Sequence, residues 1–305
     1  MKKGISLLLV LIACLSMTVS ASADSLTLYS DTSVTVYGPL NEYKPINDPA
    51  WGTAHGAVQT WVHPSWPTLD PAKWLSNTYY IEGNIAGNTW RWFQKTVALC
   101  EYAYDVSGTV RANSDNAEEV YVNGAFVGSE GAVQGPSDTG LWWKFFKDYN
   151  FEATGDNLVF DFIVRNYDGS SVPTSNPTGL IYSIDIDYSC SIEVVIDIKP
   201  ASSPSCFNND GNGIIPVAIF GSESFDVREV DVSTVLLEGL PVATKPNGKY
   251  MAAYQEMNGD GFEDLVVKFE DLDGVFEPGD EYATLTGELL DGTHFFSVGD
   301  ICVRH

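Results

Sequence analysis

Short runs in which apolar and polar residues alternate recur along this chain of 305 residues, and they limit its fold more than any other feature. One run contains Leu158, Phe160, Phe162 and Val164, and the same pattern recurs over residues 192–198. A period of two places the apolar side chains on one face of a β-strand. No segment has a long apolar period of 3.6 residues, so the sequence predicts an all-β protein.

Glycine-containing dipeptides follow several of these runs and predict tight hairpins. They are Asn123-Gly124, Asn247-Gly248 and Asp291-Gly292. Asn, Asp and Gly tolerate the positive φ angles that a two-residue type I′ turn requires. The chain therefore indicates neighbouring antiparallel strands.

The first 23 residues predict a secretion signal. Lys2 and Lys3 precede an apolar run, and Ala21-Ser22-Ala23 has the pattern of a cleavage site. The run is shorter than the roughly 20 residues that span a membrane. We predict a secreted or cell-surface protein, cleaved after Ala23. A lipid anchor on Cys14 is the alternative, because residues 11–14 also fit the cleavage pattern of bacterial lipoproteins.

The chain is strongly acidic. It has 16 Lys and Arg against 41 Asp and Glu, a net charge of −25, and loss of the two signal-peptide lysines leaves −27. Nucleic acid and anionic lipid bind basic faces, so this balance argues against both as partners.

Composition changes near residues 189–191. All eight tryptophans lie between Trp51 and Trp143, whereas the later part is rich in Val, Ile and Asp. We predict a signal peptide over 1–23, a first domain over 24–190 and a second over 191–305. The predicted strands that end at Tyr188 and begin at Ile192 leave almost no linker, so we expect the domains to pack closely.

Four cysteines remain after the signal peptide: Cys100, Cys190, Cys206 and Cys302. In an oxidising compartment an even number indicates disulfides, and four cysteines allow three connectivities. We expect pairing within each domain, Cys100 with Cys190 and Cys206 with Cys302.

Residues 256–264 have the spacing of a loop that wraps a Ca²⁺ ion. The predicted ligands are Glu256, Asn258, Asp260, the carbonyl of Phe262, and Asp264. In an EF-hand, a Glu would stand at position twelve, where this chain has Val267 in a predicted strand. We therefore predict a structural calcium loop between β-strands. The alternative is an ion-free hairpin with solvated acids.

Tryptophans supply the candidate ligand-binding residues. They are Trp61, Trp66, Trp74, Trp90, Trp92, Trp142 and Trp143. Flat aromatic rings stack on the C–H faces of sugars, which predicts carbohydrate binding. The alternative for each tryptophan is a place in the core.

No sequence motif for catalysis is present. The chain has no His-Glu-x-x-His, Gly-x-Ser-x-Gly or Walker A pattern. A glycosidase needs two carboxylates across a cleft, and an acidic chain offers such pairs by chance. We predict that the protein is not an enzyme.

Two stretches resemble known families. The second domain carries residues 195–200, 214–221, 257–261 and 285–288 in the order found in a β-sandwich module of surface proteins from methanogenic archaea and some bacteria. Family members usually have Asp in place of Glu256. The resemblance implies a non-catalytic accessory module.

The first domain is similar to galactose-binding-like jelly rolls. The likeness rests on residues 63–67, 112–116, 120–124 and 176–182. It implies a jelly-roll scaffold and no particular ligand.

Together these patterns predict a jelly roll followed by a calcium-stabilised β-sandwich. The leading hypothesis is a non-catalytic extracellular protein that binds carbohydrate or cell-envelope material. A structural component of a surface layer, matrix or filament, with self-assembly, is the second. A polysaccharide hydrolase is the third.

Overall fold

The computed structural model describes residues 23–80, 88–167, 176–200, 202–208, 211–272 and 274–304. Residues 1–22, with most of the predicted signal peptide and Cys14, lie outside this part of the chain. Strands dominate, which confirms the all-β prediction. Within the described residues the helical segments are single 3-10 turns, η1 (Pro49–Trp51), η2 (Trp142–Lys144) and η3 (Val227–Glu229). No described helix is long and apolar enough to cross a membrane.

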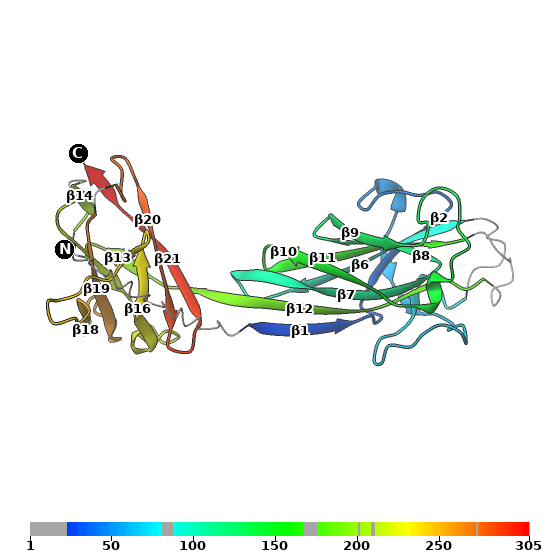
Figure 1. Cartoon of the computed structure of the whole chain (residues 1–305), viewed down its shortest axis with the longest axis horizontal. Helices are drawn as coiled ribbons and strands as arrows, with labels where there is room; N and C mark the ends of the chain where they lie inside the picture. The colour runs from blue at the N-terminus through cyan, green and yellow to red at the C-terminus, as the bar shows by residue number, and fades with distance from the viewer. Residues whose placement is uncertain are drawn as a thin grey trace, which may run out of the picture.

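Two lobes lie at opposite ends of the long axis (Figure 1). The first lobe has a sheet with β10 (Lys147–Ala153), β7 (Ala103–Asp115), β12 (Gly179–Glu193) and β1 (Asp24–Tyr29), extended by β5 (Leu75–Ser76) and β4 (Val58–Gln59). Its second sheet runs β3 (His55–Gly56), β2 (Thr35–Leu40), β6 (Thr89–Ala98), β11 (Asn157–Asn166), β8 (Ala117–Val122) and β9 (Ala125–Glu130).

These two sheets share one apolar core, so the first lobe is a β-sandwich. Phe162 of β11 stacks on Tyr182 of β12 with ring centroids 4.7 Å apart, and both side chains are fully buried. Burying one such aromatic side chain contributes about 2–3 kcal/mol. Leu158, Phe160, Phe162 and Val164 therefore face the core between the sheets, as the period of two predicts. Ile163 packs on the opposite face, in a second apolar cluster with Trp90 and Trp92.

The second lobe is also built of strands around a separate core. One sheet continues from β12 through β21 (His294–Asp300), β20 (Tyr282–Leu289), β16 (Val230–Leu237) and β17 (Leu240–Pro241). The other has β13 (Ile196–Ile198), β15 (Ile214–Ile219), β19 (Asp264–Glu270) and β18 (Ala252–Gln255), and β14 (Cys206–Asn208) pairs with β22 (Cys302–Arg304). The core residues of this lobe lie between Val194 and Val303.

Strand β12 belongs to both lobes. It pairs antiparallel with β7 from Gly179 to Cys190, and then parallel with β21 from Ser191 to Glu193. The sequence predicts two strands with a short break here, whereas the backbone stays extended through residue 193 with a bulge between Asp187 and Ser189. The break in alternation thus marks the place where β12 changes its pairing partner from β7 to β21. The strand itself does not end there.

The lobes meet over a narrow waist, in contrast to the close packing that we expect from the sequence (Figure 1). Tyr102 makes much of this contact. Its hydroxyl donates to Glu193 over 2.6 Å, its carbonyl accepts from the Ser191 N–H, and its ring meets Phe296 edge-on at 4.9 Å. The bond to Glu193 is the main reason that the pKa of Tyr102 rises to about 12.

Both expected disulfides are present. Cys100 is bonded to Cys190 at the waist, and Cys206 is bonded to Cys302 between β14 and β22. The hairpin prediction at Asn123-Gly124 is also confirmed, because both residues have positive φ angles, 48° and 80°, between β8 and β9.

Replacing Cys206 and Cys302 by serine should lower the free energy of unfolding of the second lobe. The bond closes a loop with a sequence separation of 96 residues. Its loss restores loop entropy to the unfolded chain worth roughly 4 kcal/mol. Urea unfolding followed by circular dichroism measures the change. A loss below about 1 kcal/mol would contradict the entropic account.

Candidate functional site

Four of the predicted ligand-binding tryptophans are buried. Their exposed fractions are 5% for Trp66, 3% for Trp74, 7% for Trp90 and 5% for Trp92. An indole must keep one face open to stack on a sugar ring. We therefore remove these four from the candidate ligand-binding residues.

Each buried indole also uses its N–H group inside the protein. Trp66 and Trp92 donate to the carboxylates of Asp115 and Asp161 over 2.9 and 2.7 Å, and Trp74 and Trp90 donate to the backbone oxygens of Pro67 and Val133. Buried polar groups need such partners. These tryptophans fill the first lobe and satisfy their own polar atoms there.

The other candidates, Trp61, Trp142 and Trp143, lie nearer the surface of the first lobe. Trp61 and Trp143 are half-buried and both contact His63 edge-on, with ring centroids 5.9 and 5.8 Å from its ring. Trp142 is 38% exposed, and Phe145 beside it is 69% exposed. We call these five residues the aromatic surface.

Local hydrogen bonds hold the aromatic surface in place. The backbone N–H of Ser65 donates to Nδ1 of His63 over 3.1 Å. The buried amide of Asn113, on β7, donates to the carbonyls of Trp142 and Phe145 and so fixes η2 against the sheet. The exposed rings are therefore attached to the rigid sandwich, which limits the entropy lost when a ligand binds.

The ammonium group of Lys144 lies over the ring of Trp143, 4.9 Å from its centroid. Beneath the surface, Trp66 stacks on Trp74 at 4.2 Å. The sequence prediction included neither His63 nor Phe145 in the site. The alternation of Trp61 with His63 and of Trp143 with Phe145 is the signal that could have indicated them.

Two of the buried carboxyl groups of the first lobe, Asp115 and Glu118, have strongly raised pKa values. Glu118 is 1% exposed and accepts hydrogen bonds from Ser114 and from the Tyr149 hydroxyl, and Asp115 is 6% exposed. Burial raises the pKa of each to about 7. The hydroxyls and the Trp66 indole already contact these carboxyls, so both act as parts of the interior.

The predicted calcium loop is closed by its own hydrogen bonds. Asp264 is fully buried, and its two oxygens accept from the backbone N–H groups of Gly221 and Met257 over 3.0 and 2.7 Å. This carboxylate ties the loop to the turn after β15. It is the one predicted ligand that is removed from solvent.

The exposed ligands of the loop also bond to one another. Asn258 donates to Asp260 over 2.9 Å, Asp260 accepts from the Phe262 N–H over 2.8 Å, and Glu256 accepts from the Gly259 N–H. Among the described residues, no three His, Cys, Asp or Glu side chains are grouped to hold a metal ion. Asn258 and Asp260 lie side by side. Calcium binding by this loop stays a prediction.

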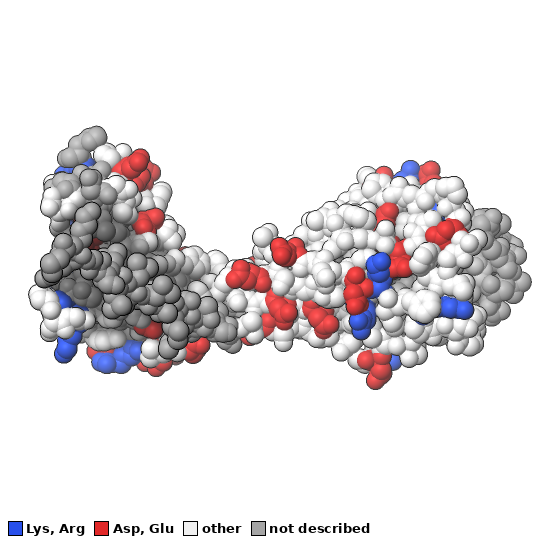
Figure 2. Space-filling model, in the orientation of Figure 1, with Lys and Arg blue, Asp and Glu red and all other residues white. Residues whose placement is uncertain are grey.

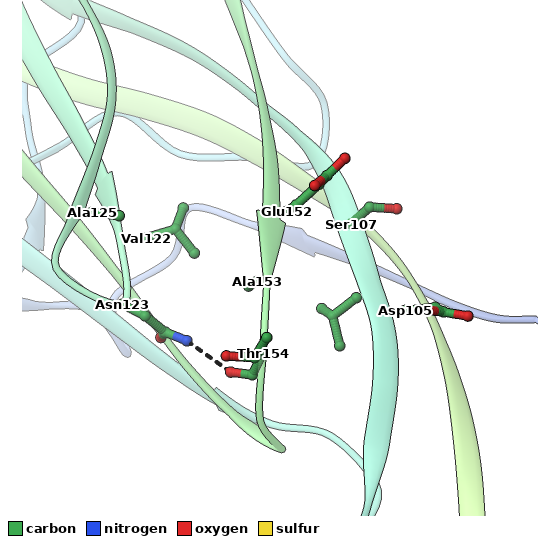
Figure 3. Close-up of a pocket in the computed structure, with 9 residues that line it drawn as sticks. Asp105, Ser107, Val122, Asn123, Ala125, Glu152, Ala153 and Thr154 are labelled. Carbon is green, nitrogen blue, oxygen red and sulfur yellow. Dashed lines mark hydrogen bonds between the residues drawn. The ribbon is translucent and has the colours of Figure 1, made fainter.

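A pocket of about 710 Å³ opens in the first lobe where β7, the β8–β9 turn and the end of β10 come together (Figure 3). Val122 and Ala153 contribute apolar groups to its walls. Asn123 points toward Thr154 and donates to its carbonyl over 3.3 Å, while its amide oxygen accepts from the Val159 N–H. The carboxylates of Asp105 and Glu152 point away from the hollow in Figure 3, so few polar groups are directed at a ligand there.

Several acidic side chains lie on the narrow middle of the molecule (Figure 2). Figure 2 shows Asp and Glu on the facing surface there, without Lys or Arg among the residues described on that face. Arg111, on β7, is engaged by Asp148 in a bidentate pair of 2.7 Å bonds. This surface repels anionic ligands, in line with the charge of the whole chain.

The chain was compared with protein families, with curated proteins and with solved structures. No protein-family model matches the chain, and no curated protein matches it. Solved structures with similarity include an FMN-binding beta-glucuronidase from Facaelibacterium prausnitzii L2-6, at 12% identity and a TM-score of 0.29. A beta-glucuronidase from Ruminococcus gnavus has 9% identity and a TM-score of 0.29.

These matches cover most of this chain but less than half of each enzyme. The match covers 93% of this chain and 40% of the first enzyme, and 92% of this chain and 45% of the second. The chain thus spans less than half the length of these enzymes. At such TM-scores the similarity carries no argument about activity or ligand. The galactose-binding-like and surface-module resemblances stay predictions.

Asp260→Asn should reduce the stabilisation of the second lobe by calcium. Asparagine keeps an oxygen that can accept from the Phe262 N–H, and it removes one negative charge from the loop. A wild-type site at about tenfold its dissociation constant gains about 1.4 kcal/mol from calcium. Thermal unfolding in calcium and in chelator measures the difference. Equal melting temperatures for wild type in the two conditions would mean that the loop binds no calcium.

Glu118→Gln should stabilise the protein above neutral pH. The pKa of Glu118 is raised in the folded state, so the folded protein holds the proton more tightly than the unfolded chain. Stability is therefore full below about pH 4 and declines as the pH rises toward 7. Glutamine mimics the protonated acid and should remove on the order of 2 kcal/mol of this decline. Urea unfolding from pH 4 to 8 tests it, with exposed Glu152→Gln as the control; parallel curves for Glu118→Gln and wild type would contradict it.

Proposed function

We propose that this protein is a non-catalytic extracellular binding protein for carbohydrate or cell-envelope material, and that the aromatic surface of the first lobe is its binding site. The observation that carries the proposal is the position of Trp61, His63 and Trp143. The rings of Trp61 and Trp143 each contact His63 edge-on, and all three side chains stay partly open to solvent. Trp142 and Phe145, on the same 3-10 turn as Trp143 and at its end, are exposed.

Aromatic rings in this arrangement suit sugars. A sugar ring has apolar C–H faces that stack on an indole, and hydroxyl groups at its rim that need hydrogen-bond partners. Lys144 and the carboxylate of Asp138, which accepts from the Trp142 indole over 3.0 Å, lie next to the rings and can meet those hydroxyls. The fixed attachment to β7 reduces the cost of ordering the site.

The remaining features support an extracellular binding role. The two disulfides fit an oxidising compartment. The buried carboxyls Asp115 and Glu118 are occupied by internal hydrogen bonds, which favours a non-catalytic role for this lobe. Calcium, in our proposal, stabilises the second lobe through the loop at 256–264 and takes no part in binding at the aromatic surface.

The combined variant Trp61→Ala and Trp143→Ala should bind its glycan about tenfold more weakly than wild type, a loss of about 1.4 kcal/mol. A glycan array identifies the ligand, and isothermal titration calorimetry measures its affinity. Phe126→Ala is the control, because Phe126 is 59% exposed on β9 and is no part of the aromatic surface.

Two outcomes would contradict the proposal. A wild-type protein that binds nothing on the array removes carbohydrate as the ligand. Unchanged affinity in the tryptophan variant, with folding confirmed by circular dichroism, removes the aromatic surface as the site.

A further inference from the structure

The second lobe has a cavity that the aromatic surface does not explain. It has a volume of about 560 Å³ and lies between the turn at 221–228 and the end of the loop at 256–264. Phe262 of the loop lines one side and is 42% exposed. Arg228 and Phe225 line it from the turn.

The two walls of this cavity are fixed to each other. The Gly221 N–H donates to the buried carboxylate of Asp264 over 3.0 Å. A Cβ atom on Gly221 would lie 2.2 Å from the carbonyl oxygen of Glu263, so the backbones approach more closely there than any other residue permits. Arg228 pairs with Glu263 over 2.6 Å. The cavity is therefore a built feature of the lobe and does not depend on the position of one exposed side chain.

Its chemistry combines an aromatic ring with several polar groups. The guanidinium of Arg228 lies over the ring of Tyr254, 4.9 Å from the centroid, which orients it while leaving further N–H groups to donate. Ser222 and Ser224 also line the cavity, and their hydroxyls lie 3.3 Å apart. Hydroxyls both donate and accept hydrogen bonds, so the cavity offers both roles.

Charge restricts the ligand further. Three acidic residues, Glu223, Asp226 and Glu263, line the cavity, against one arginine, Arg228. Asp226 accepts from the Arg228 backbone N–H and Glu263 pairs with the Arg228 guanidinium. An anionic sugar would meet repulsion from these carboxylates, whereas a neutral sugar can donate hydroxyl hydrogen bonds to them.

We propose that this cavity is a second binding site, for a neutral saccharide. The ligand stacks a C–H face on Phe262, and its hydroxyls bond to Arg228, to the serine hydroxyls and to Glu223. The site is independent of the aromatic surface, which lies in the other lobe.

Titration of the full mature chain in millimolar calcium tests this proposal. Neutral oligosaccharides are compared with matched uronic-acid or sulfated ones by isothermal titration calorimetry. Phe262→Ala should weaken neutral-sugar binding at the second site about tenfold, because the stacking surface is lost. Tyr282→Ala is the matched control, since Tyr282 is a 63% exposed aromatic residue of the same lobe outside the cavity.

A second pair of variants separates the two sites. Arg228→Met should weaken the same binding event, and the combined Trp61→Ala and Trp143→Ala variant should leave it unchanged. Binding that survives Phe262→Ala and Arg228→Met at wild-type affinity would overturn the proposal. So would equal affinity for neutral and anionic saccharides, or loss of all binding in the tryptophan variant.

Discussion

Backbone hydrogen bonding along β12 is the constraint on which the two-lobe structure depends. The strand pairs with β1 and β7 in the first lobe, and its last residues, Ser191 to Glu193, pair with β21 in the second. Since one extended segment supplies both ladders, the direction in which it leaves one sheet sets the direction in which it enters the other. Tyr102 and the Cys100–Cys190 bond reinforce the same point of the chain. The direction of one lobe relative to the other thus depends on the path of β12 between them.

The lobes differ in how they treat polar groups. In the first lobe, the indole N–H groups of Trp66 and Trp92 donate to the carboxylates of Asp115 and Asp161 in the interior. In the second lobe the interior is almost wholly apolar, and buried Asp264 is used to anchor a loop from below. The first lobe thus buries aromatic side chains together with their polar partners. The second lobe uses a buried carboxylate to hold a loop against an apolar core.

Local patterns predicted the parts of this fold that depend on local physics. Alternation placed every second residue from Leu158 to Val164 in the core between the sheets, and Asn123-Gly124 formed the expected hairpin. Both succeed because side-chain direction and φ preference depend on the nearest neighbours. The burial of Trp66 and Trp92 was not predictable in that way. Their partners, Asp115 and Asp161, stand 49 and 69 residues away, so only the tertiary fold decides which indoles are satisfied inside. The continuity of β12 was not predictable for a similar reason. It depends on pairing with β7 and β21, which are distant from β12 in the sequence.

The shared strand also decides how the molecule carries a load. If the second lobe is held in place and the first lobe is pulled by what it binds, tension runs along β12. Its antiparallel ladders with β1 and β7 then resist in shear, so their hydrogen bonds share the force instead of opening one after another. The Cys100–Cys190 bond closes this ladder at the end where the force enters. The junction between the lobes therefore resists stretching. Under tension, the loops should extend before the strand pairing at the waist breaks.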